Sequence, residues 1–185
     1  MARIDPKAQD VLDFWFVETT KEQRFKKDPD FDALIKKRFG DDVAHALEGG
    51  FPDWEDTPQG RLALIILLDQ FTRNIYRNNP KTFAGDDRAL ALSQRAVADG
   101  DMVAMEEVFH RIFTLMPMMH SEDLAVQDAS IPLFETHTDA NTLKYAIAHR
   151  DIIARFGRFP HRNAVLGRES TSEEAEFLTQ PGSSF

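Results

Sequence analysis

Five residues with polar or charged side chains follow an apolar run in the middle of the chain: Asp69, Gln70, Arg73, Asn74 and Arg77. Asp69 and Arg73 are four residues apart, so they can pair on a helix. At about 100° per residue, Gln70, Asn74 and Arg77 share one helix face. Because the arginine fork matches carboxylate and phosphate groups, this set predicts the wall of an anion site. The alternative is a polar network that anchors neighbouring loops.

A second cluster is the basic segment RFGRFPHRN, which contains Arg155, Arg158, His161, Arg162 and Asn163. Two phenylalanines are interleaved with these residues, and a glycine and a proline restrict the backbone. Basic residues after a helix also stabilise its negative end. The segment therefore predicts either an anion site or a structural role. For an anion site, we expect it to meet the polar end of the central helix.

His161 and His149 are the candidate catalytic residues, because histidine titrates nearest to neutral pH. His149 shares a helical seam with Tyr145, Ile152 and Phe156, so its side chain is expected to point inward. An inward-facing histidine is more often a hydrogen-bonded core residue than a catalyst. If catalysis occurs, these two histidines are its general acid or base.

The remaining motifs predict neither nucleophilic nor metal chemistry. Ser121 follows His120, but a Ser–His nucleophile needs an oxyanion hole and a supporting acid, and the sequence indicates neither. Ser121 is therefore expected to cap a helix. The chain has no cysteine, its six histidines are scattered, and no glycine-rich phosphate loop is present. We expect no bound metal and no cofactor.

Composition restricts the partners and the location. A formal net charge of −9 over 185 residues argues against nucleic-acid binding, which needs a basic surface. The N-terminal segment has no apolar signal core, and the longest apolar run, Leu62–Leu68, is far shorter than the ~20 residues of a membrane span. These features predict a cytoplasmic protein without a membrane partner, and they specify no oligomeric state.

Helical spacing recurs along the chain, and no segment shows the alternation of a strand, so the fold class is predicted to be all-α with about eight or nine helices. Residues 1–179 are expected to form a single domain and residues 180–185 a flexible tail. Thr57–Arg77 is the central helix, and its apolar run is expected to be buried on every side. Gly157 is expected to end the helix that reaches about Arg155. Helix starts are predicted at Asp5, Asp28, Asp86, Ser121, Asp139 or Asn141, and Ser172. Residues 19–27 are predicted to be a connector. Residues 102–119 are expected to form either one helix that is interrupted near Pro117 or two short helices.

Two motifs resemble a known family. LDQFTRNIYR (Leu68–Arg77), followed by HRDIIARFGRFPHRN (His149–Asn163), is similar to the bacterial family Domain of Unknown Function 924. Further resemblance lies in VLDFWF (Val11–Phe16), FTLMPMMHSEDLAVQD (Phe113–Asp128) and ESTSEEAEFL (Glu169–Leu178). The resemblance covers nearly the whole chain. It implies a tetratricopeptide-like α-α superhelix and implies no particular activity.

Two classes of function follow. The favoured one is an uncharacterised protein that binds a small anionic ligand between the central helix and the 155–163 segment. Its binding residues are Gln70, Arg73, Asn74, Arg77, Arg155, Arg158, Arg162 and Asn163. The alternative is a tetratricopeptide-like module for a protein or peptide partner, in which both polar motifs are structural. Motifs more than about 15 Å apart would exclude a shared ligand, because side chains reach only ~6–7 Å.

Overall fold

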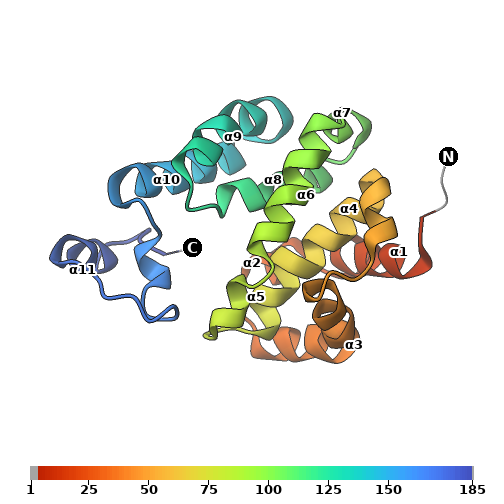
Figure 1. Ribbon diagram of the computed structural model, residues 1–185, viewed down its shortest axis with the longest axis horizontal. Coiled ribbons are helices and arrows are strands. Elements are labelled where there is room, and N and C mark those ends of the chain that lie inside the picture. The colour runs from red at the N-terminus through yellow and green to blue at the C-terminus, as the bar shows by residue number, and fades with distance from the viewer. Residues whose placement is uncertain (1–3, 185) are drawn as a thin grey trace.

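The computed structural model describes residues 4–184, and every regular element within them is helical. The helices are α1 (Pro6–Asp13), α2 (Lys21–Phe25), α3 (Pro29–Leu47), α4 (Pro58–Ile65), α5 (Thr72–Ile75), α6 (Asp86–Ala98), α7 (Asp101–Ala104), α8 (Val108–Met119), α9 (Leu124–His137), α10 (Ala140–Phe156) and α11 (Ser172–Leu178). Figure 1 shows α1 and α11 at opposite ends of the molecule. The all-α prediction is confirmed. The first three residues and Phe185, the ends of the predicted domain and tail, lie outside the described residues.

The central helix is continuous through α4, a π-helical segment (Ile66–Phe71) and α5. Every side chain from Leu62 to Leu68 is buried. Helices α1, α3, α6 and α8 all pack against this helix, and in Figure 1 it crosses the body of the molecule. An apolar surface on every side is stable only when the helix is surrounded in this way, so the sequence expectation is confirmed.

Several helix ends form by the local signals that predicted them. Thr57 Oγ1 accepts a hydrogen bond from the backbone N–H of Gly60 at 3.1 Å. Asp5 and Asp28 cap α1 and α3 in the same way, and a proline follows each of the three caps. Gly157 ends α10 with φ of 69°, a left-handed conformation that glycine adopts without steric cost. These boundaries need no tertiary contact to be specified.

An ion pair buried in the core joins α4 to α7. Arg61 Nε lies 2.8 Å from Asp101 Oδ2, and Arg61 Nη2 lies 2.7 Å from Asp101 Oδ1. Both side chains are only 4% exposed. Asp99, which is about half exposed, adds a weaker contact to the same guanidinium at 3.2 Å. The bidentate geometry fixes the short helix α7 against the start of the central helix.

Helix α6 starts against the backbone of the central helix. A Cβ atom added to Gly85, just before α6, would overlap the carbonyl oxygen of Leu68. Only glycine allows an approach this close. The contact holds Asp86, the first residue of α6, next to the polar part of the central helix.

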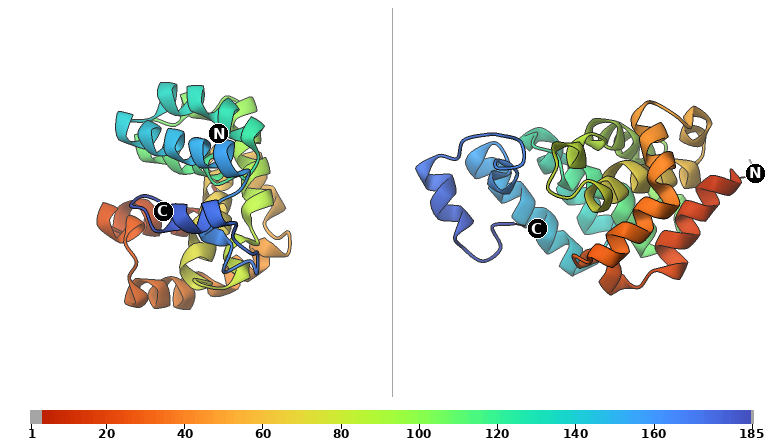
Figure 2. Two further views of the ribbon diagram at one scale, coloured as in Figure 1. Left: turned by 90° about the vertical axis from the view of Figure 1, so that its left-hand side faces the viewer. Right: turned by 90° about the horizontal axis from the view of Figure 1, so that it is seen from below.

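The C-terminal part begins with α9 and α10, which are joined by two residues and packed side by side as an antiparallel hairpin. Beyond it, Ile152, Ile153 and Phe159 form a small second core that Phe177 of α11 helps to cover. Figure 2 shows this part at the end of the molecule furthest from α1 and α3. Ser183 is buried, and its Oγ donates to the carbonyl of Leu178 at 3.2 Å. The flexibility of residues 180–185 stays a prediction.

The expectation for one short segment was wrong, and for another one of its two alternatives is confirmed. Residues 19–27 are not only a connector, because α2 forms within them. Its capping box joins Thr20 and Gln23 and supplies the end groups that so short a helix needs. Of the two alternatives for residues 102–119, the one with two short helices is confirmed by α7 and α8, whereas an interruption near Pro117 is wrong because this proline lies inside α8.

Two predicted caps are also displaced by a residue or two. Asp123, not Ser121, caps α9 by accepting from the backbone N–H of Ala125 at 2.8 Å. The N-cap position of α6 is Gly85 rather than Asp86. Within residues 4–184, no helix combines the length and apolarity required to cross a bilayer.

Candidate functional site

The π-helical segment carries a carboxylate into the interior. Asp69 is fully buried, and its Oδ1 accepts a hydrogen bond from Nδ1 of His120 at 2.7 Å. The same oxygen lies 3.0 Å from Nη1 of Arg73, and Gln70 donates to Oδ2. Burial alone would raise the pKa of Asp69, but the charges of Arg73 and His120 hold it below its usual range. Asp69 is therefore an ionised, fully hydrogen-bonded acceptor.

Asp86 joins the central helix to the 155–163 segment. Arg73 binds it with both terminal nitrogens, at 2.9 and 3.0 Å. Arg162 approaches the same carboxylate less closely, with Nη1 3.6 Å from Oδ2. Two guanidiniums from segments nearly ninety residues apart thus share one carboxylate, so the two polar motifs meet at this point.

Arg162 is held between aromatic rings, with its guanidinium 4.7 Å from the ring centroid of Phe83 and 4.6 Å from that of Phe159. Its Nη2 donates to the backbone carbonyl of His120 at 2.8 Å. The side chain is 9% exposed, and its Nε has no hydrogen-bond acceptor among the described residues. Burial, and then the positive charge of Arg73, lower the pKa of Arg162 to about 10.

Three imidazoles gather beside this arginine. The rings of His120 and His149 are 6.2 Å apart, and Phe159 lies within 5.6 Å of His149 and 5.5 Å of His161. Nδ1 of His149 also contacts the carbonyl of Tyr145 at 2.7 Å. His149 is buried, as its helical seam predicted. The cluster reaches solvent at His120 and His161, which are partly exposed.

His149 and His161 are neutral at physiological pH. Burial, followed by the charge of His120, lowers the pKa of His149 to about 3. Burial, followed by the charge of Arg162, lowers the pKa of His161 to about 4. A low pKa of this origin means that the site already holds positive charge and little water. Such a site favours an added negative charge over an added proton.

The sequence comparison identifies the family. A family model described as bacterial protein of unknown function (DUF924) matches residues 11–182. The chain belongs to this family. A solved structure of a protein of unknown function from Agrobacterium tumefaciens is 37% identical to this DUF924 chain and superimposes with a TM-score of 0.87, covering 93% of this chain and 96% of that one. No curated protein matches the sequence.

The structure divides the predicted site residues of the DUF924 chain into two groups. Gln70, Arg73, Arg162, His149 and His161 lie in or against the cluster described above.

The other predicted residues bind carboxylates elsewhere. Asn74 and Arg77 both bind Asp32 of α3, at 2.7 to 2.8 Å. Arg155 binds the exposed Glu173 at 2.7 Å. These contacts tie helices together at the edges of the cluster.

The last two predicted residues, Arg158 and Asn163, bind Glu174 of α11. Arg158 Nε lies 2.7 Å from Glu174 Oε1, and Asn163 Nδ2 lies 3.3 Å from Oε2. Glu174 also accepts from the backbone N–H of Thr171 at 2.8 Å as part of the α11 capping box. The hydrogen bond from Arg158 is the largest cause that lowers the pKa of Glu174 to about 2. This network fixes α11 to the 155–163 segment.

His120 and Asp86 are the residues of the cluster that the sequence prediction did not include, and Asp69 was part of the predicted polar set without being one of the predicted binding residues. Glu122 also belongs to this group, because it accepts from the backbone N–H of Phe159 at 2.8 Å and so positions the 155–163 segment. The available signal for these residues was the tripeptide HSE, residues 120–122. It was interpreted as a helix cap because the acid that supports His120 is 51 residues away.

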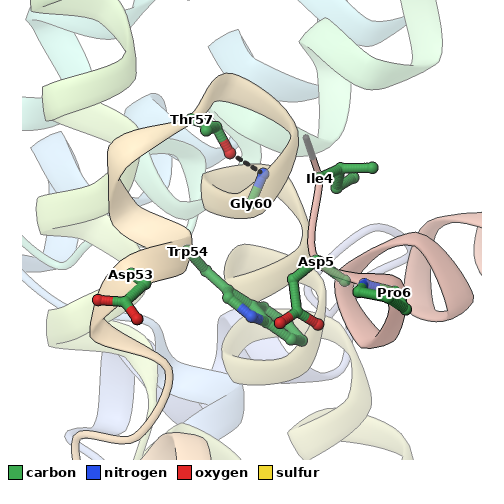
Figure 3. A pocket seen from close by; sticks show the side chains of 8 residues that line it. Ile4, Asp5, Pro6, Asp53, Trp54, Thr57 and Gly60 are labelled. Atoms are coloured by element: carbon green, nitrogen blue, oxygen red, sulfur yellow. Dashed lines mark hydrogen bonds between the residues drawn. The ribbon is translucent and has the colours of Figure 1, made fainter. Parts of the chain in front are cut away.

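Two hollows lie away from the cluster. The larger, about 470 Å³, is at the start of α4 and is lined by Ile4, Asp5, Pro6, Ala8, Asp53, Trp54, Thr57 and Gly60. Figure 3 shows the carboxylates of Asp5 and Asp53 on either side of the Trp54 indole. The second, about 350 Å³, has Glu106 and Glu107 in its wall. Both hollows carry acidic groups, so an anionic ligand is disfavoured in either of them.

No group of three or more metal-ligating side chains within residues 4–184 is arranged to hold a metal ion. The cluster instead combines guanidiniums, neutral imidazoles and one imidazole supported by a carboxylate. This set of groups can bind an oxyanion and move a proton.

Proposed function

We propose that the chain binds a small ligand bearing an oxyanion, at the cluster formed by Arg73, Arg162, His120, His149 and His161. We refer to these five residues as the Arg–His cluster. The single observation that carries the proposal is the environment of Arg162, a buried cation with an unused donor.

At Arg162, neither the charge nor the hydrogen-bond donors are fully compensated. Asp86 is already engaged by both terminal nitrogens of Arg73, and it lies 3.6 Å from Arg162, beyond a normal hydrogen bond. A buried charge whose carboxylate is shared and 3.6 Å away is only partly compensated, and a buried donor without an acceptor is costly. A bound oxyanion removes both costs, since it supplies negative charge and acceptor oxygens together.

The remaining predicted residues support the site rather than contact the ligand in this proposal. Asn74 and Arg77 hold the central helix to α3 through Asp32, and Arg158 and Asn163 hold the 155–163 segment through Glu174. Gln70 keeps Asp69 in place, and Arg155 pairs at the surface.

The proposal is tested by titrating the protein with inorganic phosphate and with citrate, followed by calorimetry and by the melting temperature. Ligand that binds only the folded state raises the melting temperature with concentration. R162Q is expected to weaken phosphate binding about 10- to 100-fold, the effect of losing a hydrogen bond between charged groups. R162K retains the charge but not the forked donors, so its affinity for phosphate is expected to lie between those of the unmodified protein and R162Q.

R95Q is the matched control, because Arg95 is exposed and pairs with Asp56 and Asp99 on another surface. It should leave anion binding unchanged. Absence of any phosphate or citrate effect on the unmodified protein would overturn the proposal, as would equal losses in R162Q and R95Q.

A second candidate is binding of a protein or peptide partner by a tetratricopeptide-like array. The α9–α10 hairpin supports it, because two of its apolar side chains, Tyr145 and Ile147, are 51% and 37% exposed. Y145S with I147S should then abolish capture of a partner from a bacterial lysate while leaving the melting temperature unchanged. Loss of folding, or capture unaffected by the double substitution, would count against this candidate.

A further inference from the structure

We propose that His120 is the proton-transfer residue of a phosphate-monoester hydrolase site, with Asp69 as its positioning residue. The inference rests on the proposed function, because the anion bound at the Arg–His cluster is the phosphate group of the substrate.

Asp69 fixes the orientation of the imidazole. Its Oδ1 accepts from Nδ1 of His120 at 2.7 Å, so in the neutral ring the lone pair is on Nε2. A second contact fixes the backbone, since Arg162 donates to the carbonyl of His120 at 2.8 Å. The residue at the end of α8 is thus held at both its ring and its main chain.

The imidazole is not required to neutralise Asp69. Arg73 already lies 3.0 Å from the same carboxylate oxygen and also donates to the Asp69 backbone carbonyl at 2.6 Å. A purely structural network would be satisfied by that arginine and Gln70. The additional histidine is better explained as a group whose tautomer the carboxylate controls.

Asp69 and His120 differ in exposure: the carboxylate is shielded from water and the imidazole is not, as proton transfer with water requires. Asp69 is completely buried, whereas the side chain of His120 is 17% exposed. His120 contacts Arg162 through its backbone carbonyl, its ring lies 6.2 Å from that of His149, and its charge acts on His161. An anion held by Arg162 therefore lies next to an imidazole that solvent water can also reach.

Phosphate esters suit this set of groups better than carboxylates do. The phosphate group presents three terminal oxygens, and catalysis of its transfer depends mainly on positioning and on donors that stabilise charge on those oxygens. Guanidiniums and imidazoles provide such donors. A carboxylate has only two oxygens and would use fewer of the donors.

The reaction balances without a further reagent. Nε2 of His120 takes a proton from water as the water oxygen bonds to phosphorus. The bond between phosphorus and the ester oxygen breaks on the opposite side, that oxygen takes a proton from solvent water, and His120 returns its own proton to solvent. The products are inorganic phosphate and an alcohol.

The experiment measures phosphate release from a panel of phosphate monoesters that includes p-nitrophenyl phosphate. H120Q is expected to lower kcat about 100- to 10,000-fold, the usual contribution of general acid–base catalysis, with KM nearly unchanged. In H120G, added imidazole is expected to restore turnover. Since a merely structural histidine would not be replaced by free imidazole, the rescue separates the two roles. H45Q, at an exposed histidine that packs on Phe51, is the matched control.

D69N tests the positioning role by nitrogen NMR of the His120 ring. The unmodified protein should show the proton on Nδ1 in the neutral ring, and D69N should lose this preference together with most of kcat. If D69N does not fold, the two His120 variants carry the test.

The outcomes distinguish the two proposals. Phosphate binding by calorimetry without turnover of any ester overturns this inference and leaves the proposed function standing. Absence of both phosphate and citrate binding overturns both proposals, and citrate binding without phosphate binding overturns this inference alone. Turnover that persists in H120Q also overturns the inference, because the activity then comes from another group.

Discussion

Acidification from neutral pH to about pH 5 is predicted to destabilise the protein through one buried and one partly exposed histidine. His149 and His161 have pKa values of about 3 and about 4 in the folded protein, against 6.5 for an exposed histidine. Their folded pKa values are lowered, so the unfolded chain binds more protons in the interval between. The stability that these neutral histidines contribute is therefore fully present above pH 6.5, and it is lost as the pH falls toward their pKa values in the folded protein.

The magnitude follows from the width of the interval that is crossed. Each pH unit below 6.5 costs about 1.4 kcal/mol for a histidine that stays neutral in the fold. Down to about pH 5, His149 thus contributes a loss of about 2 kcal/mol. The partly exposed His161 contributes about 1 kcal/mol after allowance for solvent screening. A total near 3 kcal/mol is a large part of the 5–15 kcal/mol that stabilises typical domains.

Urea denaturation at several pH values between about 7 and 5 measures this loss. H149Q should remove the largest share of the dependence, and H161Q a smaller share. Part of it should persist, because burial also lowers the pKa of His110. Buried carboxylates such as Asp69 do not interfere, since their unfolded forms take up protons only below about pH 4.5. The reasoning is refuted if stability is constant across the interval, or if H149Q retains the full dependence.

Two further predictions concern the fold. D101A leaves the buried Arg61 without its closest counter-charge and should lower the free energy of unfolding by about 3 kcal/mol. D99A, at the half-exposed carboxylate, should lower it by less than about 1 kcal/mol. Equal losses in urea denaturation would contradict the buried bidentate pair. G85A should lower the free energy of unfolding by about 1–3 kcal/mol through the backbone overlap. G40A, in the middle of α3, should raise it by about 0.5–1 kcal/mol, because a Cβ added there would lie 3.9 Å from its nearest neighbour. Melting temperatures that move in the same direction would contradict the close approach at Gly85.

Sequence reasoning succeeded where the determinant of structure is local. The starts at Asp5, Asp28 and Thr57 were correct because a capping side chain and the proline after it act within one turn. The burial of Leu62–Leu68 was correct because an apolar surface on all sides has one stable environment. Helix α2 was missed because its sequence is polar and its boundaries depend on a reciprocal cap between Thr20 and Gln23.

The candidate site was harder to predict because its contacts are distant in the sequence. Asp69 and His120 are 51 residues apart, and Arg162 meets the His120 carbonyl from 42 residues further along. Periodicity shows which residues share a face of one helix. It does not show which face of another helix they meet, so the supporting acid of His120 was not recognised.

The π-helical segment explains why the predicted polar face of the central helix divides. An α-helical rotation of about 100° per residue places Gln70, Asn74 and Arg77 together. A π turn closes its hydrogen bond one residue later, so each residue in it rotates by less and the faces shift. In the structure, Gln70 turns toward Met116 of α8, while Asn74 and Arg77 turn toward Asp32 of α3.

This shift divides the polar residues between two tasks. Asp69 reaches His120 on one side, whereas Arg77 fastens α3 on the other. A regular helix would present all of these groups to one neighbour. Single π turns inside α-helices are frequent at functional sites, and here the turn contains Asp69, the buried carboxylate that accepts a hydrogen bond from the partly exposed imidazole of His120. The geometry of the backbone and the chemistry of the side chains therefore point to the same position in the chain.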